Sequence, residues 1–247
     1  MSISVCVPVY RAHEPPNVAT LAASLPVALG GLDGELVVAL NGISAKQAGV
    51  PDGTVIVDLK LNRGVAPGWN AAAAAARGDV LVFANDDVTL GRNALAVIAQ
   101  ALHEHPDAGV VGPVGSKWDL SGAPREVESI DMADAETGEL RRCESVAGFL
   151  FACRREVFEA AGGFDESYAP CICEELDLCL AVRAQGLHCY AVGGIEHEHD
   201  YGISKARPWT RIRHNGRSEM LWRIHRRNIR HFRGKWAGRP ELGVTGK

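Results

Sequence analysis

The sequence predicts an α/β protein with a mostly parallel central sheet flanked by helices. Apolar runs alternate with helical stretches through the first 112 residues, and this alternation is typical of a parallel sheet covered by helices. Residues 80–84 are apolar without interruption, as in a strand that is buried on both faces. No window approaches the roughly 18 apolar residues that a membrane-spanning helix needs.

Five strands are expected in the first half, each a short apolar run that loop residues end. They cover residues 3–9, 35–40, 55–57, 80–84 and 108–112. Helices are expected between them, at 18–29, 69–76 and 89–105. The second of these helices contains six consecutive alanines, the strongest helix formers, and Gly78 is expected to end it. The third has apolar residues at positions 95, 98 and 102, on one helical face.

The second half has a different character. Residues 115–143 are polar and rich in acids, and are expected to form an irregular, mobile flap. Order is expected to return at 146–151, followed by helices at 154–161 and 173–185 and a strand pair at 188–192 and 195–199. Beyond them lies a basic arm in which four apolar side chains recur near helical spacing, namely Trp222, Ile229, Phe232 and Trp236.

Charge is unevenly distributed along the chain. The net charge is −4, yet residues 205–239 contain 12 Lys or Arg and one acid, Glu219. Such a basic arm on an acidic body indicates an anionic partner, which leaves lipid headgroups, a diphosphate or nucleic acid. Nucleic acid is disfavoured because no nucleic-acid-binding module is recognisable. The alternative to a membrane contact is an arm packed on its own acidic body.

The cysteines and the N-terminal residues favour a cytoplasmic protein. Seven cysteines lack paired zinc-ligand spacing, so buried reduced thiols are favoured over a metal cluster. The first residues have neither the basic nor the apolar segment of a signal peptide. A location at the inner membrane surface remains compatible with the basic arm.

Two adjacent carboxylates, Asp86 and Asp87, follow the buried strand at 80–84. In open α/β sheets, ligands bind beyond the carboxyl ends of the strands. Paired carboxylates suit a hard divalent cation such as Mg²⁺, which also takes phosphate oxygens. The alternative is a surface turn whose Asp caps a helix.

Six motifs in order along the chain carry a resemblance to a known family. They are Ser4–Tyr10; Asn62-Arg63-Gly64 with Asn70; Gly78-Asp79 leading to Asn85-Asp86-Asp87; Arg154-Arg155 to Gly162–Glu166; Glu174–Leu178; and His197–Ser204. Together they resemble family 2 glycosyltransferases of the GT-A fold, in particular rhamnosyltransferase-like bacterial members. The resemblance implies a single GT-A catalytic domain over 1–204, with a nucleotide-binding half (about 1–114) and an acceptor-binding half (about 115–204). A basic helical extension over 205–247 would follow.

The resemblance also implies a reaction. An inverting, divalent-metal-dependent glycosyltransferase would move a sugar from a UDP-, dTDP- or GDP-linked donor to an acceptor hydroxyl by single displacement. The acceptor would be a glycan, a lipid-linked glycan or a small molecule, and a homodimer is compatible with the sequence. The alternatives are a sugar nucleotidyltransferase and a non-catalytic nucleotide-sugar-binding protein. The first would need a glycine-rich phosphate loop after the first strand, which residues 8–13 do not provide.

Residue roles follow from the matched motifs. Mg²⁺ or Mn²⁺ would be held by Asp87, aided by Asp86 and by His199, with His197 as the alternative imidazole. Glu175 is expected to be the base, in a cluster with Glu174 and Asp177; alternatively these acids only offset a helix dipole. The donor-binding residues are expected to be Pro8, Val9, Tyr10, Arg11, Asn41, Asn62, Gly64, Asn70, Asn85, Asp86 and Gly148. Where the family often has an Asp that contacts the nucleobase, this chain has Leu40, which leaves the identity of the base open.

Overall fold

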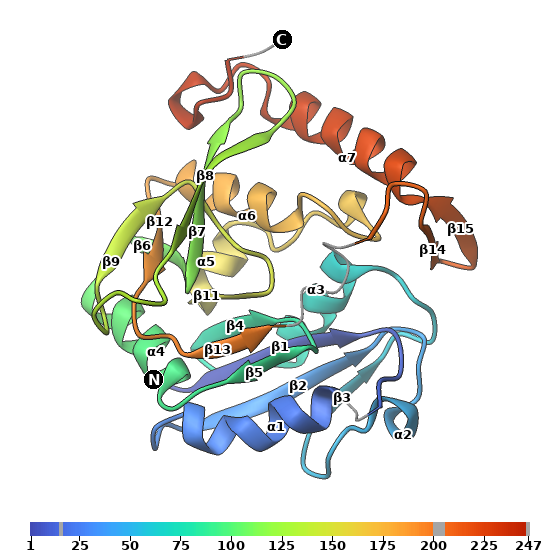
Figure 1. Ribbon diagram of the computed structural model, residues 1–247, viewed down its shortest axis with the longest axis vertical. Coiled ribbons are helices and arrows are strands. Elements are labelled where there is room, and N and C mark those ends of the chain that lie inside the picture. The colour runs from blue at the N-terminus through green and yellow to red at the C-terminus, as the bar shows by residue number, and fades with distance from the viewer. Residues whose placement is uncertain (15–16, 200–205, 246–247) are drawn as a thin grey trace.

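A computed structural model describes residues 1–14, 17–199 and 206–245 (Figure 1). Its centre is an eight-stranded sheet. The strand order is β3 (Val55–Asp58), β2 (Gly34–Leu40), β1 (Ile3–Val9), β4 (Val80–Ala84), β11 (Leu150–Arg154), β6 (Ala108–Gly112), β12 (His188–Val192) and β9 (Leu140–Cys143). The four strands from β3 to β4 are parallel, whereas β11 and β9 run antiparallel to their neighbours. The predicted α/β class is confirmed, and the second half of the sheet is mixed.

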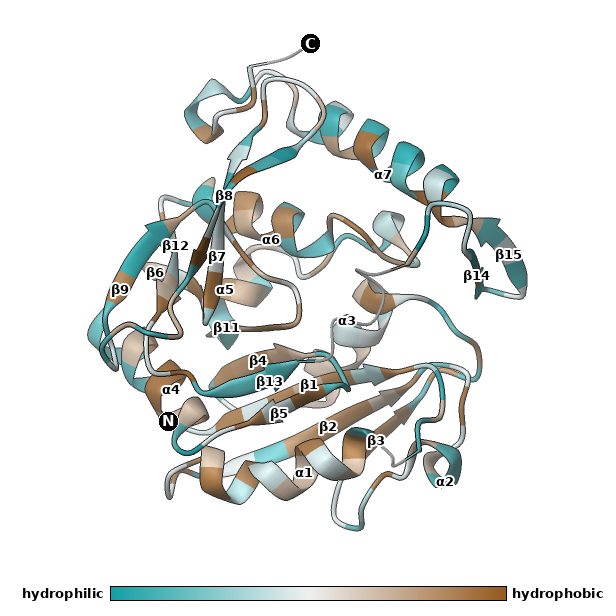
Figure 2. Cartoon of the chain, in the orientation of Figure 1, coloured by the Kyte–Doolittle hydropathy of each residue, from teal (hydrophilic) through white to brown (hydrophobic). Residues whose placement is uncertain are grey.

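Helices cover both faces of this sheet. Their bounds are α1 Asn17–Ala28, α2 Ala45–Ala48, α3 Val65–Ala75, α4 Ala94–Glu104, α5 Arg155–Ala160 and α6 Glu174–Arg183. Side chains of α1 and α4 share one apolar cluster with Val5 and Val7. Those of α3, α5 and α6 share a second cluster with Cys6. Because alternate residues of β1 face opposite clusters, the strand is buried on both sides, and Figure 2 shows the apolar colour concentrated on β1, β2 and β4.

The predicted helix at 89–105 is wrong in its first turn. Residues Val88–Leu90 form a strand, β5, which pairs with β13 (His197–His199). Helix α4 begins only at Ala94, after Asn93 in the left-handed conformation (φ 58°). Long-range strand pairing thus overrides the local helical pattern.

The predicted irregular flap at 115–143 is also wrong. It contains β7 (Val114–Asp119) and β8 (Arg125–Asp131), which pair with each other, and β9 at the edge of the main sheet. Strand β7 also pairs with β10 (Ser145–Val146). In β8 only Ile130 is buried, so this strand lacks the apolar alternation from which it could be recognised.

The expected strand pair near residue 190 is not formed. Strand β12 pairs with β6 and β9 in the main sheet, whereas β13 pairs with β5. Because β13 lies against β5, His199 is brought close to the acids that precede β5.

The basic arm folds into a hairpin and a helix. Strands β14 (Arg211–His214) and β15 (Arg217–Met220) meet at Asn215-Gly216, both with positive φ, as a type I′ turn requires. The predicted helix is present as α7 (Leu221–Trp236). The short helices η1 (Glu166–Tyr168) and η3 (Pro240–Leu242) complete the described elements, and no described helix is long and apolar enough to cross a membrane.

Helix α7 packs on the body along one stripe. Its buried residues recur every fourth position, at Ile224, Asn228, Phe232 and Trp236. Phe232 and Trp236 share an apolar cluster with Leu180 of α6. Of the four residues expected to form this stripe, Trp222 instead lies exposed.

Candidate active site

A pocket of about 740 Å³ opens at the carboxyl ends of β1, β2 and β4, where ligands of open α/β sheets bind. The hairpin β14–β15 forms its other side. Ten of the residues that the sequence singled out line this one pocket. They are Pro8, Tyr10, Arg11, Asn41, Asn62, Gly64, Asn85, Asp86, Asp87 and His199.

Backbone contacts shape the floor of the pocket. The amide of Asn41 donates to the carbonyl of Gly64 at 2.8 Å, and its oxygen accepts from the backbone N–H of Arg63 at 2.6 Å. Gly64 has φ +106°, and a Cβ there would lie 2.7 Å from Cα of Pro170. Only glycine therefore fits at this position, and Asn41 holds the loop in place.

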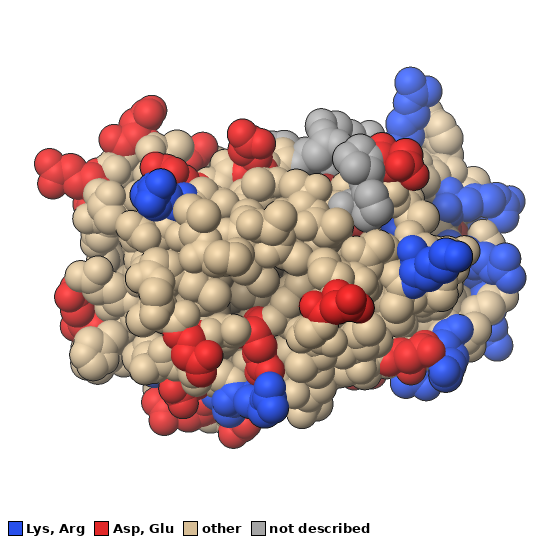
Figure 3. All heavy atoms as spheres, turned by 90° about the horizontal axis from the view of Figure 1, so that it is seen from below, with Lys and Arg blue, Asp and Glu red and all other residues tan. Residues whose placement is uncertain are grey.

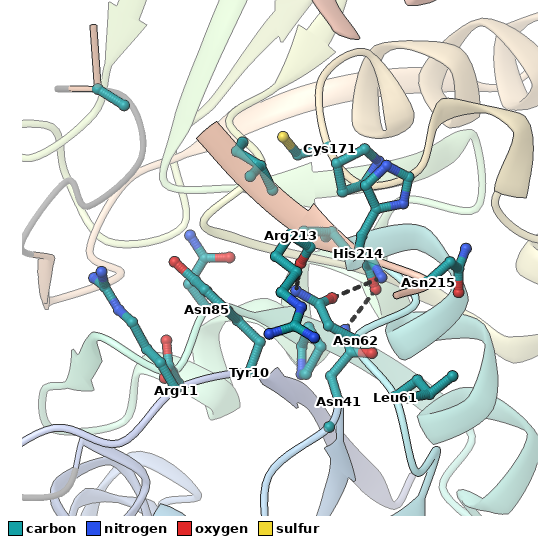
Figure 4. A pocket seen from close by; sticks show the side chains of 18 of the residues that line it. Tyr10, Arg11, Asn41, Leu61, Asn62, Asn85, Cys171, Arg213, His214 and Asn215 are labelled. Atoms are coloured by element: carbon teal, nitrogen blue, oxygen red, sulfur yellow. Dashed lines mark hydrogen bonds between the residues drawn. The ribbon is translucent and has the colours of Figure 1, made fainter. Parts of the chain in front are cut away.

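Asn62 joins this floor to the hairpin (Figure 4). Its side-chain amide donates to the carbonyl of Arg213 at 3.0 Å, and its backbone carbonyl accepts from the N–H of Asn215 at 2.7 Å. The two hydrogen bonds fix β14 over the pocket, and the guanidinium of Arg213 lies among the pocket residues in this view. Asn62 thus positions the hairpin.

The acids after β4 lie beside His199. Oδ1 of Asp87 is 3.2 Å from Nε2 of His199, and both side chains are largely buried. Burial and the neighbouring charge of Asp87 raise the pKa of Asp86 to about 6. His197 instead contacts the carbonyl of Ile195 through Nδ1, at 2.9 Å, so His199 is the imidazole that meets the acids.

Asp87 and His199 fit a divalent cation that is shared with a diphosphate. Such a cation needs one or two protein ligands, because phosphate oxygens and water complete its coordination. Imidazole is a better ligand for Mn²⁺ than for Mg²⁺. Among residues 1–14, 17–199 and 206–245, no three His, Cys, Asp or Glu are grouped as a complete metal site. The pair therefore suits a substrate-bridged ion and not a closed protein cage.

Glu175 stands against the same strand end, although it does not line the pocket. A Cβ on Gly148 would lie 3.1 Å from Cδ of Glu175. The carboxyl group of Glu175 therefore occupies the space beside Gly148, an expected donor-binding residue that does not line the pocket. The next residue, Phe149, accepts from the backbone N–H of Asn85 at 2.9 Å and stacks on His199 with 4.4 Å between ring centroids. The acids that follow β4 and the start of α6 therefore flank one region.

Glu174 and Glu175, the first two acids of α6, differ in how deeply they are buried. Burial raises the pKa of Glu175, and burial followed by the charge of Glu175 raises the pKa of Glu174 well above its ordinary value. Glu174 is almost fully enclosed, whereas Glu175 is partly exposed. Of the two residues, Glu175 is the more exposed.

Asp177, expected in the catalytic cluster, has a different role. It is buried, and accepts hydrogen bonds from the hydroxyl of Tyr168 (2.9 Å), the indole of Trp236 (2.7 Å) and Nζ of Lys235 (2.7 Å). These partners come from η1 and α7, so Asp177 fastens α7 to the body. Three acids in one turn do not reveal from sequence which of them faces inward.

Asn228 of α7 supports the loop that leads into α6. Its amide lies 2.6, 2.8 and 3.0 Å from the carbonyls of Tyr168, Cys171 and Ile172. Ile172 and Cys173 both have positive φ, which costs a non-glycine residue energy and persists where surrounding contacts enforce it. Asn228 supplies such contacts, next to Glu174 and Glu175.

Two further expected donor residues lie outside the pocket. Val9 is buried in β1 and shares the apolar cluster of α1 and α4. Asn70 donates to the carbonyl of Phe164 and accepts from the backbone N–H of the same residue, both at 2.9 Å. Asn70 therefore holds the loop before η1 and does not bind a ligand in this pocket.

Several pocket residues were missed from the sequence. They are Gly42, Lys60, Leu61, Val65, Pro170, Cys171, Ala206, Thr210, Arg211, Ile212, Arg213, His214, Asn215 and Gly216. The hairpin had a recognisable signal, since Asn-Gly between short polar strands favours a type I′ turn. Nothing local indicated that the turn folds back onto Asn62.

Three comparisons with known proteins bear on this site. The family model described as "Glycosyl transferase family 2" matches residues 4–160. An O-antigen biosynthesis protein RfbC from Myxococcus xanthus is 30% identical over 57% of this chain, and an uncharacterized protein y4gI from Sinorhizobium fredii is 29% identical over 47%. The alignments span only 14% and 15% of those relatives, respectively.

A solved structure shares the fold. The crystal structure of GalNAc-T7 with UDP, GalNAc and Mn²⁺ superposes with a TM-score of 0.67 at 14% identity. The superposition covers 98% of this chain and 54% of that one. The likeness extends through the hairpin and α7 as well as the sheet.

Proposed function

Because the chain belongs to glycosyl transferase family 2 and has the GT-A fold, we propose that it is an inverting, divalent-metal-dependent glycosyltransferase. Its donor is a nucleotide-diphosphate sugar, and its acceptor offers a hydroxyl group. One observation carries this proposal. The pocket has two carboxylates and a histidine on one side and arginines of β14 on the other, an arrangement suited to a metal-bound diphosphate.

The donor diphosphate lies between these two sides. Asp87 and His199, aided by Asp86, would hold Mg²⁺ or Mn²⁺. A cation held there would supply positive charge close to the departing diphosphate. Arg211 and Arg213 face the opposite side of the same group, where guanidinium groups make charge-assisted bonds to phosphate oxygens.

Glu175 acts as the base. It takes the proton of the acceptor hydroxyl, the oxygen attacks the anomeric carbon, and the bond from that carbon to the diphosphate breaks. The raised pKa of Glu175 suits proton transfer nearer to neutral pH. Support comes from its place beside Gly148, one residue from the contact between Phe149 and Asn85.

The nucleobase is bound without the Asp that the family often has at the end of β2, where this chain has Leu40. Leu40 is buried, and both polar groups of the Asn41 side chain are already bonded to the loop at residues 63–64. The base is instead contacted by Lys60, Leu61 and the hairpin residue Asn215, which line the same pocket. UDP-, dTDP- and GDP-sugars all remain candidate donors.

The acceptor is a bacterial surface glycan or its lipid-linked precursor. This choice follows the relative that is named for O-antigen biosynthesis. A small-molecule acceptor is the alternative.

Donor screening tests the proposal. The protein is mixed with UDP-, dTDP- and GDP-sugars, with Mn²⁺ or with EDTA, and its melting temperature is recorded, since selective binding to the folded state raises it. One nucleotide class should raise the melting temperature only with metal, and release nucleoside diphosphate when an acceptor is added. Release of pyrophosphate would instead indicate a nucleotidyltransferase, and binding without product for any acceptor would indicate a binding protein.

A further inference from the structure

Two exposed tryptophans flank the base of the hairpin, one on each side along the chain. Trp209 is 62% exposed and Trp222 is 44% exposed. The backbone N–H of Trp222 donates to the carbonyl of Pro208 at 2.9 Å, and that of Leu221 donates to Thr210 at 2.9 Å. These bonds hold the backbones of residues 208–210 and 221–222 together, so the two exposed tryptophans project from adjacent segments.

Arginines accompany both indoles. The guanidinium carbon of Arg207 lies 5.8 Å from the ring centroid of Trp209, and that of Arg223 lies 5.2 Å from Trp222. Arg226 and Arg230 follow on the exposed face of α7. Among the described residues, none of these four arginines has an ion-pair partner. We name Arg207, Trp209, Trp222, Arg223, Arg226 and Arg230 the tryptophan–arginine surface.

The opposite face of α7 already has its partners. Lys235 pairs with Asp165 and Asp177, and His231 with Asp165. Near the start of the helix, Arg227 pairs with Glu219. The helix therefore meets its own acidic body on one side only. The tryptophan–arginine surface lies on the other side, where the body does not cover it.

Basic side chains prevail at this end of the molecule. Figure 3 shows most of the Lys and Arg of the face seen from below at the right-hand end, the side on which β14 and β15 lie in Figure 1, with a few acids among them, while acidic side chains prevail over the rest of the face. Such a patch complements an anionic surface. The exposed indoles favour a lipid membrane among the anionic partners, because Trp is enriched where an apolar phase meets water.

We propose that the tryptophan–arginine surface binds the protein to anionic lipid membrane. The indoles of Trp209 and Trp222 enter the headgroup region, and the arginines bind lipid phosphates. The hairpin that begins at this surface also forms one side of the pocket, so membrane binding holds the pocket mouth near the lipid. The proposal concerns binding alone and does not depend on the reaction that the pocket performs.

Vesicle co-sedimentation tests this proposal. The purified full chain is mixed with vesicles of phosphatidylcholine, alone or combined with phosphatidylglycerol, at low and high salt. Binding should require the anionic lipid and weaken with salt. The Arg223→Glu, Arg226→Glu double variant should bind at least twenty-fivefold more weakly, since each arginine near a charged surface contributes about fivefold, or about 1 kcal/mol. Trp209→Ala, Trp222→Ala should also lose most binding.

A matched control changes the same charge elsewhere. Arg141 and Arg142 are exposed on β9, at the far edge of the main sheet, and replacing both with Glu alters the net charge equally. This control should keep wild-type binding, and all variants should keep the wild-type melting temperature. If the Arg223→Glu, Arg226→Glu variant and the control variant lost equal vesicle affinity, net charge alone would explain binding, and the proposal would be overturned. Full vesicle binding by the tryptophan variant would also overturn the proposal, because the indoles would then not enter the headgroup region.

Discussion

Two neighbouring glutamates at the start of α6 differ in what they can touch. Glu175 lies beside Gly148, whereas Glu174 is enclosed. Replacing Glu175 with Gln should lower kcat by about a hundredfold to ten thousandfold and leave donor affinity unchanged. Glu174→Gln is the matched control and should retain most activity. Titration of donor binding and turnover for both variants decides the point, and a Glu175→Gln enzyme with wild-type kcat would exclude Glu175 as the base.

The pH dependence of turnover follows from burial of Glu175. A base works only when deprotonated, and burial raises the pKa of this carboxyl above its ordinary value of 4.5. Activity should therefore be complete at high pH and fall as the pH drops through the raised pKa, at a higher pH than for an exposed glutamate. A profile of kcat against pH measures the midpoint. A midpoint at or below 4.5 would contradict this assignment.

The hairpin offers a comparison at the scale of one element. Arg213 on β14 lines the pocket, while Arg217 on β15 does not. Arg213→Ala should weaken donor binding by about tenfold or more, because charge-assisted hydrogen bonds contribute about 1.5–3 kcal/mol each. Arg217→Ala should leave it unchanged. Calorimetry with donor and Mn²⁺ measures both affinities, and equal affinities in the two variants would exclude Arg213 from the donor site.

Helix α7 carries a prediction about stability. Asn228 is fully buried and bonds three carbonyls of the loop before α6. Asn228→Ala should lower the free energy of unfolding by about 1–3 kcal/mol or more, because buried carbonyls lose their donor. Arg230→Ala, on the exposed face, should change it by less than about 0.5 kcal/mol. Urea unfolding followed by circular dichroism compares them, and similar midpoints would show that Asn228 does not support the loop.

For the whole molecule, the sequence predicted those parts whose pattern is local. Strands β1, β2, β4 and β6 are largely apolar, and their predicted bounds lie within a residue or two of the observed ones. The short strand β5 and the exposed strand β8 were missed because their structure depends on partners distant in sequence. Strong local patterns are informative, whereas pairing of polar strands is decided by tertiary contacts.

The site was predictable to the same extent. Residues that follow parallel strands, such as Asp86 and Asp87, must lie at one edge of the sheet, and they do. Asn70 and Asp177 were assigned from their motifs, but their hydrogen bonds tie the chain together. A polar side chain with a structural partner looks the same in sequence as one that awaits a ligand. The contribution of β14 could not be foreseen because it depends on where the hairpin docks.

The docking of Asn228 has a consequence for biosynthesis. The loop that precedes Glu174 and Glu175 receives its support from a helix more than fifty residues further along the chain. A ribosome therefore releases the complete central sheet before it releases the helix that holds this loop. We expect nascent chains stalled ahead of residue 221 to resist proteolysis over their sheet and yet be cleaved near residues 169–173, and to gain protection there only once α7 has emerged.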